Sequence, residues 1–284
     1  MANETVFADI QTVAAFLAAD LGPALRAKLI MPNLCHIENF KVGSDSLKLR
    51  VKGSLSATSA SEATDHATSQ YQQSTPATLT VAEKKVYVEI SDKNRLWSGA
   101  DIAEILEEMV NACGDKIDID AMALFDGFST NAGAYSADCS DVILAEAAYK
   151  LETNNAPGPF AYALHTKQWW DVKEDVIAAA ASVYTNPARV ELFSGQPSAN
   201  GFKGMFFDVP VFVSTNAESV NTNADWSGAC LAVNHALALG LGGDVRIELD
   251  RDIKKGVDQL AASVWYDVKE YRDLCGVQIR SQKA

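Results

Sequence analysis

The hydrophobic pattern of the chain is strongest between Trp97 and Gly127. Apolar residues recur there in steps of one, three and four, which places them on one side of a helix. These positions are Ile102, Ile105, Leu106, Met109, Val110, Cys113, Ile117, Ala121 and Leu124. Ser98 followed by Asp101 is a capping-box pattern that marks the start. We therefore expect one long amphipathic helix, which runs through Gly114 and ends near Phe125. Its polar side carries three acidic residues, Glu104, Glu107 and Glu108.

A second helical pattern covers residues 5–21. Its apolar positions are Val6, Ile10, Val13, Leu17 and Leu21, and Gly22-Pro23 marks its end. This helix needs a surface against which to bury its apolar side, either in its own domain or on a neighbouring subunit. Residues 25–40 show no such pattern, and we expect an irregular connection there.

Alternation of apolar and polar residues predicts two half-buried strands, at 47–51 and 86–90. Between them, from Gly53 to Thr80, Ser, Thr and Ala make up 17 of 28 residues, and Lys and Arg are absent. A segment with so little apolar area does not offset its own ordering entropy. We expect a long hairpin tip that orders only against a partner; a solvated insertion is the alternative.

The second half of the chain mixes helices and strands without regular βαβ repetition, which is typical of the α+β class. We expect a polar loop at 128–140, a helix at 142–151, a turn at 154–159 and a strand at 160–164. Thr166 caps a further helix that carries Trp169 and Trp170 and continues, after a break, into 176–183. A hairpin is expected at 201–214, and strands at 245–249, 264–268 and 277–279.

The charge of the chain argues against direct binding to nucleic acid. Its formal net charge is -13, and the Lys84-Lys85 and Lys254-Lys255 pairs are too short to form a basic patch. A hydrophobic content of 48% is typical of a globular protein. There is no apolar run of about 18 residues and no basic segment at the start, so we expect a chain that is neither exported nor inserted into a membrane.

No motif predicts a catalytic or binding site. The four histidines are scattered, without the spacing of metal ligands: His36, His66, His165 and His235. The five cysteines contain no Cys-x-x-Cys and are predicted to be reduced and buried. Gly240 to Asp244 lacks the Lys-Ser/Thr of a phosphate loop, and no Ser or Cys falls in a nucleophile signature. We expect no enzymatic activity, no catalytic, cofactor-binding or metal-binding residue, and no cofactor.

Several short segments follow one another in a characteristic order. Residues 84–88 (KKVYV) precede the long helix and residues 119–127 (IDAMALFDG) end it; residues 154–157 (NNAP) precede the strand at 160–164 and Trp169, and the hairpin at 201–214 follows. From about residue 40 to 280, this order resembles the major capsid protein of tailed bacteriophages, the Hong Kong 97-type fold. No single segment is specific; the ordered set carries the resemblance.

The resemblance implies an α+β fold with five parts. They are an N-terminal arm (1–40), an extended E-loop hairpin (41–95), a peripheral domain with the long spine helix (96–139), an axial domain (140–243) and strands that return to the peripheral domain (244–284). In such a fold, the arm and the hairpin find their partners on other copies of the chain. Each contact can then be weak, because several hold every subunit at once.

The resemblance also implies a function. We expect a structural protein that self-assembles as pentamers and hexamers into an icosahedral shell around the double-stranded DNA of a phage, without sequence-specific DNA binding and without a membrane. It would be a virion component assembled in the host cytoplasm. Scaffolding, portal and decoration proteins are further expected partners. Two alternatives stay open: the shell of an encapsulin-type compartment, and a cytosolic enzyme with a lid at 53–80, motivated by His165, Trp169 and Trp170.

Overall fold

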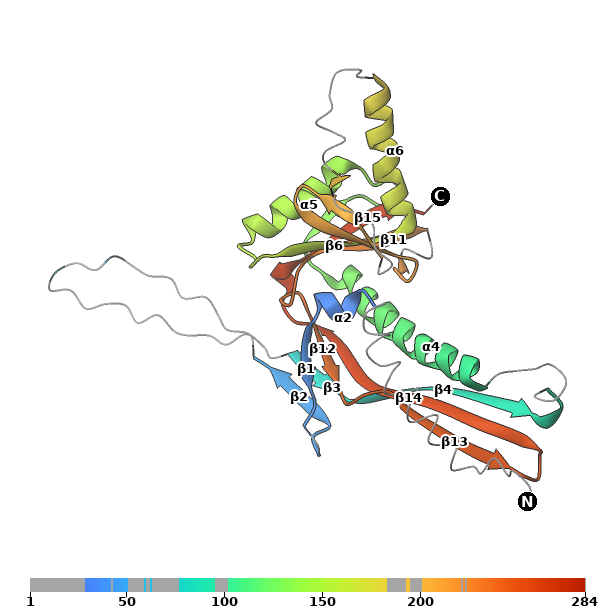
Figure 1. The fold of residues 1–284 in the computed structure, drawn as a ribbon. Coiled ribbons are helices and arrows are strands. Elements are labelled where there is room, and N and C mark those ends of the chain that lie inside the picture. Colours follow the sequence, from blue (N-terminus) through green and yellow to red (C-terminus); the bar gives the residue numbers. More distant parts are fainter. Residues whose placement is uncertain are drawn as a thin grey trace.

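The computed structural model of the chain describes residues 29–41, 43–50, 59, 62, 77–94, 102–182, 193–194, 201–220, 222 and 224–283. An eight-stranded sheet carries two helices, and an elongated five-stranded sheet carries one long helix (Figure 1). The predicted helix at 5–21 and nearly all of the polar segment at 53–76 lie outside the described residues, as do the capping residues Ser98 and Asp101.

The apolar stripe of the sequence forms α4, Ile102–Met122. As predicted, the helix continues through Gly114, and it spans about 32 Å at about 1.5 Å per residue. It ends at Met122, before the expected end at Phe125, and a 3-10 turn, η1, Phe125–Gly127, follows. The stripe is buried from Leu106 to Ala121, whereas the three glutamates are exposed.

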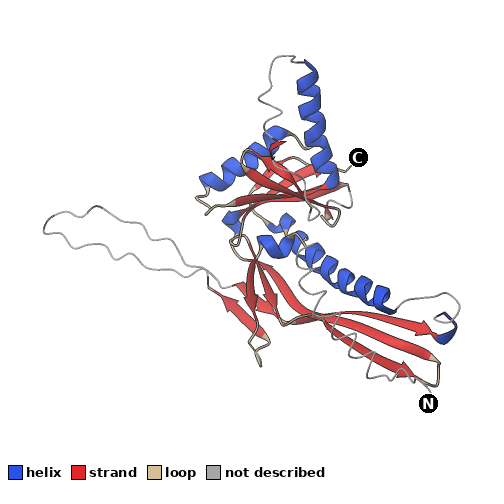
Figure 2. Cartoon of the chain, viewed as in Figure 1, coloured by secondary structure: helices blue, strands red, loops and turns tan. Residues whose placement is uncertain are grey.

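The five-stranded sheet lies beneath α4 (Figures 1 and 2). Its order is β1-β12-β14-β13, and β4 pairs with β14 as well. The strands are β1 His36–Asn39, β4 Ala82–Ser91, β12 Leu237–Leu241, β13 Arg246–Asp252 and β14 Val257–Glu270. The predicted strand at 86–90 is confirmed, because Val86, Val88 and Ile90 belong to the core under α4 and the residues between them are exposed.

Two predictions within the first 80 residues are wrong. Residues 29–40 are no irregular connection; they contain α2, Met31–Leu34, and β1. Both depend on distant partners, since Asp118 of α4 accepts hydrogen bonds at the start of α2 and β1 pairs in parallel with β12. Residues 77–80, assigned to the polar tip, form β3, Ala77–Thr80, which pairs with β2, Ser46–Leu49. Leu79 is fully buried there.

The eight-stranded sheet has the order β5-β15-β11-β6-β9-β8-β7, with β10 paired to β11. Its strands are β5 Asn131–Gly133, β6 Phe160–His165, β7 Phe193–Ser194, β8 Phe202–Phe206, β9 Val209–Ser214, β10 Ser219–Val220, β11 Asp225–Ala232 and β15 Gly276–Gln282. The predicted strands at 160–164 and 277–279 and the hairpin at 201–214 are confirmed. The predicted loop at 128–140 is wrong in part, because β5 adds to the sheet beside β15.

Two helices pack on this sheet (Figure 2): α5, Asp141–Thr153, and α6, Thr166–Ser182. The helix predicted at 142–151 is confirmed, and Ser140 caps it through a hydrogen bond from the Ile143 N–H. The break predicted within the next helix is wrong, since α6 is continuous. Core residues fill both faces of the sheet: Tyr162 and Leu164 of β6 belong to the α5–α6 core, whereas Ala161 and Ala163 join the core that contains α4.

Candidate functional site

The residues that suggested an enzyme do not share a site. The His165 ring stacks on Trp226 with 3.6 Å between ring centroids, and its Nδ1 accepts a hydrogen bond from the Lys167 N–H. Burial, helped by the charge of Lys283, lowers the pKa of His165 to about 4. Trp169 is buried in the α5–α6 core, whereas Trp170 is 58% exposed. This arrangement gives the lid-enzyme alternative no catalytic constellation.

The other candidate chemistry is dispersed in the same way. All five cysteines are buried and unpaired, as predicted: Cys35, Cys113, Cys139, Cys230 and Cys275. Burial raises their thiol pKa values, so they act as core residues. Within the described ranges, no group of three or more His, Cys, Asp or Glu is placed to hold a metal ion, and no described helix is long and apolar enough to span a membrane. His66 lies outside the described residues.

The glycine-rich stretch near Gly240 serves packing. Gly240 is part of β12, and a Cβ atom there would approach the Phe40 ring to 2.7 Å. The absence of a side chain therefore lets a strand lie directly beneath an aromatic ring.

A buried carboxylate joins the long helix to the segment that precedes the five-stranded sheet. Asp118 is 4% exposed, and its two oxygens accept hydrogen bonds from the N–H groups of Ile30 (3.3 Å) and Met31 (3.0 Å). Burial disfavours its ionised form and raises its pKa to about 6, although the two backbone donors act in the opposite direction. No sequence motif predicted this role; the one signal in the sequence is that Asp118 stands beside Ile117, on the apolar side of the helix.

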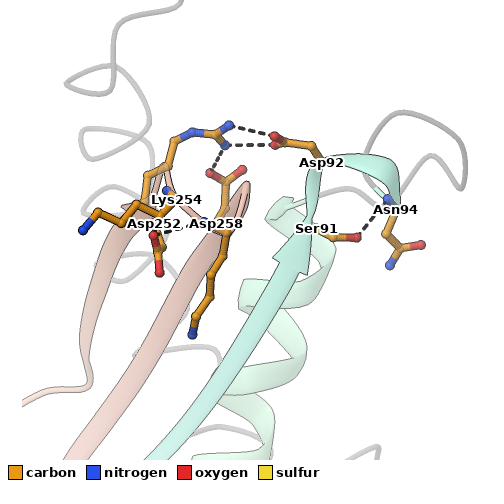
Figure 3. A network of polar contacts seen from close by, with 8 residues as sticks. Ser91, Asp92, Asn94, Asp252, Lys254 and Asp258 are labelled. Atoms are coloured by element: carbon orange, nitrogen blue, oxygen red, sulfur yellow. Dashed lines mark hydrogen bonds and ion pairs between the residues drawn. The ribbon is translucent and has the colours of Figure 1, made fainter.

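The far end of the five-stranded sheet is held by charge. Arg251 of β13 donates hydrogen bonds to both carboxylate oxygens of Asp92 (3.0 and 2.9 Å) and to Asp258 (2.6 Å). Asp92, just after β4, and Asp258, in β14, lie on the same side of this tip (Figure 3). The Asp252 carboxylate accepts from the N–H groups of Lys254 and Lys255, which closes the β13–β14 turn. Three separate chain segments are thus fastened at one exposed point.

At β4 and β13, one face of the five-stranded sheet is polar. Lys85 and Glu248 approach to 3.9 Å across it, and the Tyr87 hydroxyl donates to Glu89 (2.7 Å), which also accepts from Gln259. The acceptor raises the pKa of Tyr87 to about 12, since ionisation of the phenol would break the hydrogen bond. β4 and β13 therefore present an extended polar face, which ends at the tip that Arg251 fastens. Such features suit recognition of another protein surface.

Comparisons with known proteins identify the fold. No protein-family model matches the chain, and no curated protein matches it in sequence. Solved structures do match. The capsid of Ralstonia phage GP4 aligns with a TM-score of 0.66 and 10% identity, over 91% of this chain and 92% of that chain. The capsid of cyanophage P-SCSP1u aligns with a TM-score of 0.65 and 13% identity, over 90% and 89%.

A third match comes from a bacterial compartment. The holo-SrpI encapsulin complex of Synechococcus elongatus PCC 7942 aligns with a TM-score of 0.63 and 9% identity, over 88% of this chain and 85% of that chain. Sequence identities this low carry information about the fold alone. The chain has the Hong Kong 97-type fold in its mixed α+β form, as the sequence analysis predicted.

Proposed function

We propose that this chain is a major capsid protein, a structural subunit that self-assembles into a closed icosahedral shell around a phage genome. The observation that carries the proposal is the shared fold, which extends over about nine-tenths of the chain and of the phage capsid subunits that it matches. A match of this extent leaves little of the chain for a separate catalytic domain. The proposed role is structural and non-enzymatic, with the subunits arranged in pentamers and hexamers.

The arrangement of the described parts supports this proposal. Within the described residues, the eight-stranded sheet is covered on both faces at β6 and β11, whereas the five-stranded sheet ends in a tip held by ion pairs and presents polar side chains on one face of β4 and β13. A net charge of -13 lets the shell wall enclose DNA without trapping it. Scaffolding, portal and decoration proteins belong to the same proposal, as do assembly in the host cytoplasm and the final location in the virion.

The domain division is a further part of the proposal. It has an arm at 1–40, an E-loop at 41–95, a peripheral domain at 96–139 and 244–284, and an axial domain at 140–243. The packing of α4 on β14 in one core supports joining the two peripheral segments. β4, which lies within the segment assigned to the E-loop, also pairs with β14. β15, from the last segment, lies in the eight-stranded sheet beside β11, and β12, from the axial segment, lies in the five-stranded sheet. The chain thus crosses between the two sheets more than once.

The test is the size of the purified full-length protein. Light scattering and negative-stain electron microscopy should show particles of megadalton mass at high concentration. A chain that stays monomeric under those conditions would contradict the proposal. Arg280→Gln serves as a matched control, because Arg280 lies in the eight-stranded sheet and its Nε donates to Gln278 of its own strand (2.9 Å). That variant should form the same particles.

The encapsulin match supports a second candidate function, the shell of a protein compartment that holds a cargo protein. Particle contents separate the two. Particles isolated from the natural source should contain nuclease-protected double-stranded DNA if the chain is a phage capsid protein. Particles that contain a co-purifying protein and no DNA would favour the compartment.

A further inference from the structure

Three distant segments meet beside the start of β1. The N–H of Asn234, in the turn between β11 and β12, donates to the carbonyl of Leu34 (2.8 Å). The N–H groups of Tyr271 and Arg272, just after β14, both donate to the carbonyl of Ala236 (2.8 and 3.2 Å). Backbone hydrogen bonds therefore hold the end of α2, the β11–β12 turn and the end of β14 against one another. The position of this meeting point is therefore fixed by the backbone and does not depend on side-chain rotamers.

Basic side chains gather at this meeting point. The rings of His36 and Tyr271 stack nearly parallel, with 5.7 Å between their centroids. The guanidinium carbon of Arg272 lies 5.2 Å from the centroid of the Tyr271 ring. His235 lies in the same turn, next to Ala236, whose carbonyl accepts the Arg272 N–H. Burial lowers the pKa of His235, and the charges of Arg272 and His36 lower it further. The Nε2 atom of His36 lies 3.1 Å from Glu38. Glu38 is thus the partner of His36. Arg272 is the group in this cluster that is charged at every physiological pH.

Arg272 lacks the partner that its chemistry calls for. Its side chain is half-buried, its Nε atom is buried without a hydrogen bond, and it forms no ion pair with any residue that the structure describes. The buried Cys275 thiol interacts with it, but sulfur is a weak acceptor. Arg251, by contrast, holds two carboxylates at an exposed position. A buried guanidinium donor left unsatisfied is costly, and the planar fork fits a carboxylate with two parallel hydrogen bonds.

The charge of the chain indicates where that carboxylate comes from. Each copy carries 37 acidic and 24 basic side chains, so the surface of another copy presents mainly carboxylates. Binding to a nucleic-acid backbone uses several spaced cations, whereas this site has one guanidinium between two histidines. We propose that Arg272, stacked on Tyr271 beside His235 and His36, is the receptor for an acidic side chain of a second copy of this chain. The proposal rests on the assembly function above and adds a specific contact to it.

The experiment compares full-length variants for assembly and for the thermal stability of dilute subunits. Arg272→Gln should raise the concentration needed for assembly by about tenfold or more, as expected when a desolvated charge pair between subunits is broken. The melting temperature of dilute subunits should stay unchanged. Arg272→Lys keeps the charge and loses the fork, so its effect should be intermediate. Arg280→Gln, which removes a guanidinium that already donates to Gln278 of its own strand in the eight-stranded sheet, should assemble like the wild type.

Each other outcome overturns the inference. If wild-type and Arg272→Gln subunits assemble equally well, the contact is wrong and the shell function stands. If wild-type subunits stay monomeric, both fail. A lower melting temperature of Arg272→Gln and Arg272→Lys subunits, with assembly reduced in proportion, would place the carboxylate partner within the same chain. Normal empty particles that no longer retain DNA would assign Arg272 to a phosphate.

Discussion

The two sheets of this chain differ in how completely one copy covers them. In the eight-stranded sheet, β6 is buried along its central residues and β11 along nearly its whole length, because helices cover one face and the α4 core covers the other. In the five-stranded sheet, β4 and β13 alternate between half-buried and exposed positions. In the part of the chain that the structure describes, β6 and β11 of the first sheet are thus covered on both faces. In the second sheet, β12 is covered on both faces as well, since Ala238 packs with Leu49 and Leu79, whereas β4 and β13 carry polar and paired charged residues on one face in place of an apolar layer.

This difference predicts where the folding free energy lies. A strand buried on both faces removes more apolar surface from water than a strand buried on one face, and the stabilisation follows the area removed. The eight-stranded sheet should therefore fix the stability of the subunit. The five-stranded sheet should contribute less to stability, while its open face and its tip stay available to other copies.

The largest expected effect tests this comparison directly. Leu231 of β11 is 1% exposed, whereas Leu249 of β13 is partly buried at the margin of the same core. Leu231→Ala should lower the free energy of unfolding by about 3 kcal/mol and Leu249→Ala by about 1 kcal/mol, since the first leaves a closed cavity. Urea unfolding of dilute subunits measures both values. Equal losses would show that the two sheets contribute alike.

A pH effect comes next in size and lies where α4 meets α2. The pKa of Asp118 is raised from 3.8 to about 6 by burial, so the folded subunit binds this proton more tightly than the unfolded chain does. Its stabilising effect is full below about pH 4 and is lost as the pH rises through 6. Asp118→Asn cannot ionise. The stability of the wild type relative to this variant should therefore fall by on the order of 2 to 3 kcal/mol between pH 4 and pH 7.

Urea unfolding at a series of pH values checks this prediction. Glu108→Gln is the matched control, because Glu108 is an exposed acid on the same helix. Its pH profile should stay nearly parallel to that of the wild type. Parallel profiles of wild type and Asp118→Asn would contradict the role of the buried carboxylate.

The smallest expected effect is a gain in stability at the edge of the eight-stranded sheet. Phe207 and Asp208 form the two-residue turn between β8 and β9 with φ of 47° and 63°. Such turns favour Asn or Gly, and a bulky residue in this conformation is strained. Phe207→Asn should stabilise the subunit by about 0.5 to 1 kcal/mol in thermal unfolding. The gain is limited by loss of the ring contact with Phe206, whose centroid lies 4.6 Å away.

Phe207→Ala separates the effect of the backbone strain at position 207 from that of the ring contact with Phe206. It removes the ring and keeps a side chain that disfavours the left-handed conformation, so it should destabilise the subunit slightly. If the Asn variant loses as much stability as the Ala variant, the ring contact outweighs the backbone strain, and the exposed aromatic is there for packing within the chain.

Local hydrophobic patterns were sufficient to predict an element where one of its faces is buried along its length. The stripe from Ile102 to Ala121 predicted α4, and the alternation at 86–90 predicted β4, because both elements bury one side against a continuous core. The same patterns failed for β1 and β5, which are three or four residues long and exist through pairing with β12 and β15. A strand this short carries too few residues to show a period.

The sequence by itself determined the α+β class, the long helix, most of the longer strands and the lack of a catalytic motif, since each follows from residue type and local spacing. Only the tertiary structure decided that Asp118 is buried against α2 and that Arg272 meets His36 and His235. These positions depend on groups dozens to hundreds of residues away. Their physical effect, burial of a charge, arises only when the chain has closed around it.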